Sequence, residues 1–219
     1  DELQGVVAHE MSHIINRDVL VMTFAGMMLG AITLMAEVFT RSLWFGGGSR
    51  YKSKSSDKGG QAQIIILVLA IALAILGPIM AQLLYFAISR KREYLADASA
   101  VRLTRYPDGL ASALEKISGS NLDLKTANKV TAPMYIINPL KKKGMQLSNV
   151  TSTHPPITER INILRSMTQG VNYANYQNAF NSVKGKSSGL IPQSGLTDSS
   201  KISLRDSELS QTSFETDKQ

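Results

Sequence analysis

The hydrophobic residues of this chain are concentrated in two long blocks from which charged residues are excluded. Residues 19–36 contain no Asp, Glu, Lys or Arg, and residues 64–88 contain none either. A helix needs about 20 predominantly apolar residues to cross a bilayer. We therefore predict two transmembrane helices, over residues 19–39 and 64–88, with a kink at Pro78 in the second. The alternative for the second block is a soluble core helix, although such helices are usually shorter and amphipathic.

The more polar stretches predict a loop, short helices and a tail. Residues 40–63 are rich in Gly, Ser and Lys and predict a connecting loop. Residues 110–117 and 158–167 have the composition of short packing helices. Beyond residue 170 the chain contains ten serines and few large apolar residues. We therefore predict one domain at residues 1–169 and a disordered, serine-rich tail at residues 170–219, with no structure in the tail beyond a helical turn at residues 173–180.

The charged residues are predominantly basic and give the chain a formal net charge of +7. The basic residues that adjoin the apolar blocks are Arg41, Arg50, Lys52, Lys54, Lys58, Arg90, Lys91 and Arg92. This placement favours membrane flanks, and no nucleic-acid partner is expected. The chain contains no cysteine, which excludes disulfides, a thiol nucleophile and a Cys-type zinc site. Any metal ligands must therefore be histidines and carboxylates.

The segment His9-Glu10-Met11-Ser12-His13 carries the strongest chemical signal in the sequence. Residues four apart on a helix project from the same side, so the two histidines can bind one metal ion while the glutamate lies beside them. This spacing is typical of zinc metallopeptidases, in which the glutamate is the general base. A catalytic zinc also needs a third protein ligand and an open position for water. The motif alone can arise by chance, so the third ligand decides the interpretation.

A candidate third ligand follows the second apolar block. If that helix continues past the block, Glu93 and Asp97 lie four residues apart and share one face. Glu93 would then complete the ligand set, and Asp97 would accept a hydrogen bond from the remote ring nitrogen of a ligand histidine. The alternative is an ordinary surface ion pair between Glu93 and Arg90 or Lys91.

Three motifs occur in order along the chain. They are Ala8-His9-Glu10-x-Ser12-His13 with Asn16 and Asp18, then Arg92-Glu93-x-x-x-Asp97, and finally Ser152-Thr153-His154-Pro155-Pro156-x-x-x-Arg160-Ile161. Over residues 1–167 the chain thereby resembles the HtpX-type membrane zinc metallopeptidases, relatives of the CAAX-prenyl proteases within the gluzincin group. That family normally carries further N-terminal membrane segments. A chain that begins at Asp1 without a signal peptide is therefore expected to be part of a longer protein.

The expected fold is mainly α. It is a zincin-like helical metallopeptidase domain in which the two long hydrophobic helices are inserted between the zinc-binding helices. A small β-hairpin within residues 134–147 stays open, because the pattern there is too weak to assign it.

The resemblance also implies roles for seven polar residues of the three motifs. It implies that His9, His13 and Glu93 bind the single zinc ion and that Glu10 is the catalytic base. It implies Asp97 as a support for a ligand histidine, and it brings His154 and Arg160 to the active site. His154 would stabilise the oxyanion or cap the zinc reversibly. The alternative for His154 is a structural His-Pro-Pro turn before a helix that begins near Thr158.

The expected protein is a multi-pass, membrane-bound zinc endopeptidase that acts on polypeptides in the lipid bilayer. The resemblance implies the inner membrane, an active site that faces the cytoplasm, and misfolded or surplus membrane proteins as substrates. A shared metal requires an even number of crossings between His9 and Glu93, and two spanning blocks satisfy this. The basic loop between the blocks argues against its translocation, so a re-entrant hairpin is the alternative topology. The alternative functions are a non-catalytic metal-binding adaptor, against which Glu10 argues, and prenyl-peptide processing.

Overall fold

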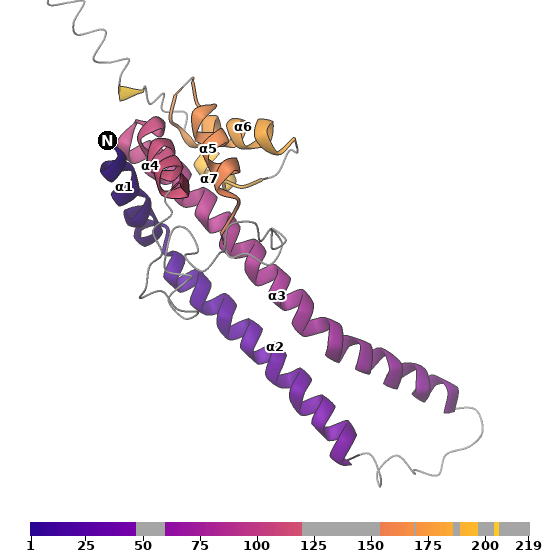
Figure 1. Ribbon diagram of the computed structural model, residues 1–219. Coiled ribbons are helices and arrows are strands. Elements are labelled where there is room, and N and C mark those ends of the chain that lie inside the picture. The colour runs from indigo at the N-terminus through magenta and orange to yellow at the C-terminus, as the bar shows by residue number, and fades with distance from the viewer. Residues whose placement is uncertain (47–59, 120–153, 169, 186–188, 197–203, 206–219) are drawn as a thin grey trace, which may run out of the picture. The chain divides into compact units, whose positions relative to one another are not determined.

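The computed structural model describes residues 1–46, 60–119, 154–168, 170–185, 189–196 and 204–205, and every regular element over these residues is a helix. The helices are α1 (Glu2–Ile15), α2 (Asp18–Gly46), α3 (Gly60–Thr104), α4 (Pro107–Gly119), α5 (Ile157–Arg165), α6 (Tyr173–Lys184) and α7 (Gln193–Leu196), as labelled in Figure 1. One compact unit comprises residues 20–88, and the other comprises residues 1–19 and 89–219. The prediction of a mainly α fold is confirmed. The hairpin considered for residues 134–147 lies outside the described residues.

The unit of residues 20–88 contains the two apolar helices. The stretches Asp18–Ser42 and Ile64–Thr104 are long and apolar enough to cross a membrane, and none of their most apolar windows is buried within the structure. Large apolar side chains point outward instead, and Phe24 and Ile66 are 58% and 66% exposed. A soluble core helix would bury such side chains. These two helices therefore have the length, the composition and the exposed apolar side chains that a membrane-spanning helix needs, as the charge-free blocks predicted.

Both apolar helices are longer than the sequence pattern predicted. α2 continues to Gly46 and α3 begins at Gly60, so both extend into residues 40–63. Near the end of α2, Glu37 and Arg41 form an ion pair of 2.8 Å across one helical turn. Such pairs stabilise an exposed turn by a few tenths of a kcal/mol, which helps α2 to continue past its apolar block. The loop prediction is wrong for these helical ends, and the rest of that stretch lies outside the described residues.

α3 is a single helix of 45 residues that carries both the second apolar block and the candidate third ligand. It passes through Pro78 without ending, although proline removes one helical hydrogen bond. The residues that follow are mostly Ala, Leu, Ile, Arg, Lys and Glu, and several of these are strong helix formers. The predicted continuation of this helix through Glu93 and Asp97 is confirmed, so both side chains lie on one face.

In the other unit, α1 and α4 approach each other closely at two glycines. A Cβ atom on Gly5 would lie 2.7 Å from the backbone nitrogen of Leu110. A Cβ atom on Gly109 would lie 3.0 Å from the carbonyl oxygen of Asp1. Only glycine permits this approach without a shift of the backbone. This contact fixes the position of α1 against α4. Helix α4 includes residues 110–117 and so confirms the short helix predicted there.

α5, α6 and α7 pack on the same core, although α6 and α7 lie in the stretch that we predicted as a disordered tail. Tyr176, Phe180 and Ile191 are at most 5% exposed. The side-chain oxygen of Gln177 accepts the backbone N–H groups of Leu190 and Ile191, each at 3.0 Å. The prediction of disorder is wrong here, because a few apolar residues at helical spacing bury one face of α6. Serine content averaged over the whole tail does not reveal that spacing. α5 confirms the predicted packing helix after the His-Pro-Pro segment.

Candidate metal centre

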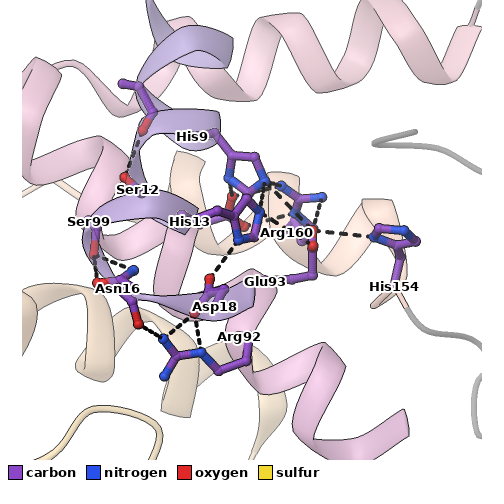
Figure 2. Close-up of polar contacts among 12 residues, drawn as sticks. His9, Ser12, His13, Asn16, Asp18, Arg92, Glu93, Ser99, His154 and Arg160 are labelled. Atoms are coloured by element: carbon purple, nitrogen blue, oxygen red, sulfur yellow. Dashed lines mark hydrogen bonds and ion pairs between the residues drawn. The ribbon is translucent and has the colours of Figure 1, made fainter. Parts of the chain in front are cut away.

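Helix α1 holds His9 and His13 side by side on one face. Gly5, Ala8, His9 and Ser12 form its buried face, which packs into the domain. His9 is 1% exposed and His13 is partly buried at the edge of the same face. The two rings meet edge to face with centroids 4.7 Å apart, and their Nε2 atoms are 3.2 Å apart (Figure 2). The four-residue spacing therefore directs two imidazole nitrogens to one point.

Glu93 of α3 brings a carboxylate to the same point. Its Oε1 lies 3.6 Å from Nε2 of His13, and its Oε2 lies 3.7 Å from Nε2 of His9. One ligand atom from each of these three residues can be chosen so that all lie within 4.8 Å of one another. Ligand atoms that are about 2.0–2.1 Å from a tetrahedral zinc ion lie roughly 3.3 Å from one another. The spacing of the three groups in the structure therefore fits a zinc ion.

The Nδ1 atom of each histidine faces a carboxylate, and this determines the protonation state of its Nε2 atom. Nδ1 of His9 lies 3.0 Å from Oδ1 of Asp97, and Nδ1 of His13 lies 2.6 Å from Oδ2 of Asp18. An ionised carboxylate accepts a hydrogen, so Nδ1 carries the proton in each neutral ring and Nε2 carries the lone pair. Two lone pairs and the carboxylate of Glu93 then converge, and only a cation or a proton between them relieves the repulsion. This donor set of two imidazoles and one carboxylate fits a zinc ion chemically as well.

A buried arginine neutralises the carboxylates behind the histidines. Arg160 of α5 is 1% exposed and donates to Asp97 through Nε at 2.8 Å and NH2 at 2.7 Å. Its NH1 donates to Oε2 of Glu93 at 3.3 Å, and its NH2 lies 3.5 Å from Nε2 of His9. Burial alone would raise the pKa of Asp97, but the Arg160 charge, together with the interactions with His9 and the hydrogen bonds from Arg160, outweighs burial and lowers it. Arg160 therefore keeps the carboxylate of Asp97 ionised although it is buried.

The pKa values of His9 and Glu93 also depend on their neighbours. Burial alone would lower the pKa of His9, but the hydrogen bonds with Asp97 and Glu93 outweigh it and raise the pKa to about 9. Burial alone would raise the pKa of Glu93, but hydrogen bonds from His154 and His9, together with the Arg160 charge, hold it well below its usual range. Without a metal ion, the cluster therefore binds a proton on His9 at neutral pH.

The structure places His154 at the rim of the cluster. It lies just before α5 and is partly buried, with Nδ1 at 3.4 Å from Oε2 of Glu93. Glu10 directly follows His9 on α1, and its exposed side chain makes no hydrogen bond or ion pair with another described residue. An exposed carboxylate next to a ligand histidine in the chain is available for proton transfer. All seven polar residues singled out in the sequence thus lie in the cluster or beside one of its members.

Sequence reasoning missed the roles of Asp18 and Arg92, although both residues belong to the motifs quoted above. Asp18 is buried at the start of α2 and contacts His13, while Arg92 of α3 pairs with Asp18 (Figure 2). The available signal was a carboxylate five residues after His13, in a short polar break between two apolar stretches. That pattern does not show which way the chain turns, so the contact could not be derived from spacing.

Comparisons with known proteins identify the family. The sequence profile of "Peptidase family M48" matches residues 1–168, which include every residue of the cluster. A "Protease HtpX homolog" of Dictyoglomus thermophilum is 50% identical over 166 residues, 76% of this chain and 51% of the relative. Relatives of the same description from Caldanaerobacter subterraneus and Lactobacillus helveticus are 48% and 44% identical over 169 and 167 residues, 77% and 76% of this chain.

The extent of these matches limits what they show. The chain spans about half the length of the curated relatives it matches, 51% to 55% of each. No solved structure matches it. The two apolar helices and the His-His-Glu cluster agree with a metal-binding membrane peptidase domain. With its family profile matched over residues 1–168, the chain belongs to peptidase family M48, as its resemblance to the HtpX-type metallopeptidases predicted.

Proposed function

We propose that the protein is a zinc-dependent endopeptidase of the inner membrane that hydrolyses peptide bonds in membrane proteins. The observation that carries the proposal is the convergence of His9, His13 and Glu93, with an exposed glutamate, Glu10, directly after His9 on α1. One zinc ion per chain, held by these three residues, supplies Lewis-acid chemistry for peptide hydrolysis when it is bound. Membership of a peptidase family supports polypeptides as the substrates.

Each polar residue around the three ligands has a task that follows from its position. Glu10 is solvent-exposed and takes a proton from the attacking water, then delivers it to the leaving amine. Asp97 orients His9, since it lies 3.0 Å from Nδ1 and is itself held by Arg160. His154 lies at the rim, 3.4 Å from Glu93, and is placed to donate a hydrogen bond to the oxyanion that develops on the substrate.

A glutamine in place of Glu10 separates metal binding from catalysis. The full chain in detergent, wild type and Glu10→Gln, is compared for zinc content and for cleavage of a membrane-protein reporter. We expect both to hold one zinc ion, and the variant to lose at least a hundredfold in cleavage rate, which is the usual contribution of a general base. Glu93→Ala is expected to lose both the zinc ion and the cleavage activity. Full zinc content with an uncut reporter in the wild type would instead support a non-catalytic metal-binding protein.

The proposed topology places the cluster on the cytoplasmic side of a multi-pass protein. His9 precedes α2 and Glu93 lies near the end of α3, so two crossings return the chain to the side from which it left. The basic residues at positions 90–92 favour the cytoplasmic side for the cluster. A Ser55→Cys variant in sealed membrane vesicles tests this topology, because the chain contains no other cysteine. Labelling from the periplasmic side only supports two full crossings, and labelling from the cytoplasmic side only supports a re-entrant hairpin.

A further inference from the structure

The second ligand histidine has a support of its own that parallels the one behind His9. Nδ1 of His13 lies 2.6 Å from Oδ2 of Asp18, whose side chain is almost fully buried. Oδ1 of the same carboxylate pairs with the guanidinium of Arg92, which contributes both Nε and NH2. Each ligand histidine thus faces a buried carboxylate, and each carboxylate is paired with an arginine. Figure 2 shows the Asp18–Arg92 pair behind His13.

The turn between α1 and α2 is shaped to bring Asp18 back to His13. Arg17 has a φ of 55°, in the left-handed region that residues other than glycine seldom adopt. The backbone N–H of Asn16 donates to Ser12 at 2.9 Å, so α1 is complete before the chain reverses. A left-handed residue costs of order 1–3 kcal/mol, and it persists only where surrounding contacts over-determine it.

Contacts from α3 stabilise the left-handed conformation of Arg17. NH2 of Arg92 donates to the carbonyl oxygen of Asn16 at 2.5 Å, at the turn itself. The side-chain amide of Asn16 donates to Oγ of Ser99 at 3.1 Å. Arg92 also immediately precedes Glu93 on α3. One arginine therefore joins the carboxylate behind His13 to the helix that carries the third ligand.

We propose that Asp18 and Arg92 are positioning residues of the metal centre, with Asp18 fixing the ring of His13 and Arg92 fixing Asp18. The proposal rests on the zinc site described under Proposed function. Asp18 accepts the Nδ1 proton and so leaves the Nε2 lone pair of His13 directed at Glu93 and His9. Arg92 balances the buried charge of Asp18 and contacts its carboxylate through two nitrogens. Lysine has a single side-chain nitrogen and cannot make this contact.

Ser99 provides a matched control for a purely structural role. Its bond with Asn16 also ties the α1–α2 turn to α3, but no contact of Ser99 among the described residues reaches His13. If Asp18 and Arg92 only held the turn in place, Ser99→Ala would disturb the metal centre as much as they do. If they orient His13, only their variants would alter the coordination of a bound metal.

The test uses Co²⁺ as the metal probe, because its visible spectrum reports the geometry of its ligands. Wild type, Asp18→Ala, Arg92→Ala, Arg92→Lys and Ser99→Ala are titrated as the full chain in detergent after metal removal. We expect Asp18→Ala and Arg92→Ala to weaken Co²⁺ binding by roughly 10- to 100-fold and to shift its spectrum. Arg92→Lys should recover only part of this loss, and Ser99→Ala should stay within about threefold of wild type with an unchanged spectrum.

The outcomes separate this inference from the proposed function. A wild-type chain that binds no Co²⁺ overturns the zinc site and this inference with it. Tight binding by the wild type, with affinity and spectrum unchanged in Asp18→Ala, overturns this inference alone. An equal loss in Ser99→Ala overturns it too, since the turn would then act only as a tether. Should Asp18→Ala fail to fold, the Arg92 variants decide in the same assay, because an affinity and a spectrum unchanged in both Arg92→Ala and Arg92→Lys would refute the proposal.

Discussion

Removal of the metal ion should make the cluster bind a proton, and metal binding should release it. The pKa of His9 is raised from 6.5 to about 9, because the hydrogen bonds with Asp97 and Glu93 outweigh the effect of burial. A raised pKa in the folded state stabilises the metal-free fold below pH 6.5, and this stabilisation is lost as the pH rises through 9. Metal binding has the opposite dependence, because the ion must displace the proton.

The size of the effect follows from the displacement of the pKa. Each pH unit corresponds to about 1.4 kcal/mol, so the shift from 6.5 to about 9 is worth roughly 3 kcal/mol to the metal-free fold at neutral pH. His9 is 1% exposed, so solvent screens this interaction little. Competition with the proton should weaken the apparent metal affinity at pH 7 by about 100-fold relative to its value above the pKa of about 9.

Metal affinity and proton release are measured together. Zinc affinity of the chelator-treated chain is determined by competition with a calibrated chelator between pH 7 and 9.5, and proton release by calorimetry in buffers of different ionisation enthalpy. We expect the affinity to rise about tenfold per pH unit and to level off near the His9 pKa of about 9. Asp97→Asn removes the negative charge that faces His9 and helps to raise this pKa, so its affinity should level off at a lower pH. An affinity in the wild type that does not change between pH 7 and 9 would refute the reasoning.

Four further predictions concern the packing around the cluster, each measured by thermal or urea unfolding in detergent. Gly5→Ala should destabilise by about 1–3 kcal/mol, because a Cβ there meets the backbone of α4, whereas Gly119→Ala, with open space at its Cβ, should change little. Tyr94→Phe should cost about 1 kcal/mol because it loses a 2.7 Å bond to α5. Tyr176→Phe should cost nothing, since the buried Tyr176 hydroxyl has no partner among the described residues, and a large loss would contradict this. Phe180→Ala should cost about 3–5 kcal/mol, and a neutral result would place α6 outside the core.

Local spacing predicted the parts of the site that depend on one helix at a time. His9 and His13 share a face because they are four residues apart, and Glu93 shares a face with Asp97 for the same reason. The charge-free blocks likewise predicted two helices long enough to cross a membrane. Each of these features needs only the helical repeat and the chemistry of the residue types. The sequence is therefore informative wherever one element decides the outcome.

Features that join distant parts of the chain could not be read from such patterns. Arg92 and Asp18 are 74 residues apart, and their pairing depends on a left-handed turn at Arg17. The sequence does not indicate this turn, because the position is not occupied by glycine. Helix α6 was predicted as no more than a turn at residues 173–180, because its Asn-rich sequence is polar on average, while Tyr176 and Phe180, four residues apart, complete the core. Average composition reports neither the turn nor the buried face. Both depend on packing partners from elsewhere in the chain.

The charges around the two histidines explain why one site can serve both a proton and a metal ion. Three buried carboxylates contact the histidines, and two arginines pair with them, which leaves one net negative charge when both rings are neutral. A proton on His9 brings the total to zero, in agreement with its raised pKa. A divalent cation brings the total to one positive charge instead. A positively charged, desolvated site favours the oxyanion that develops when a peptide carbonyl is attacked, so the two arginines help to set the sign of the charge that peptide hydrolysis requires.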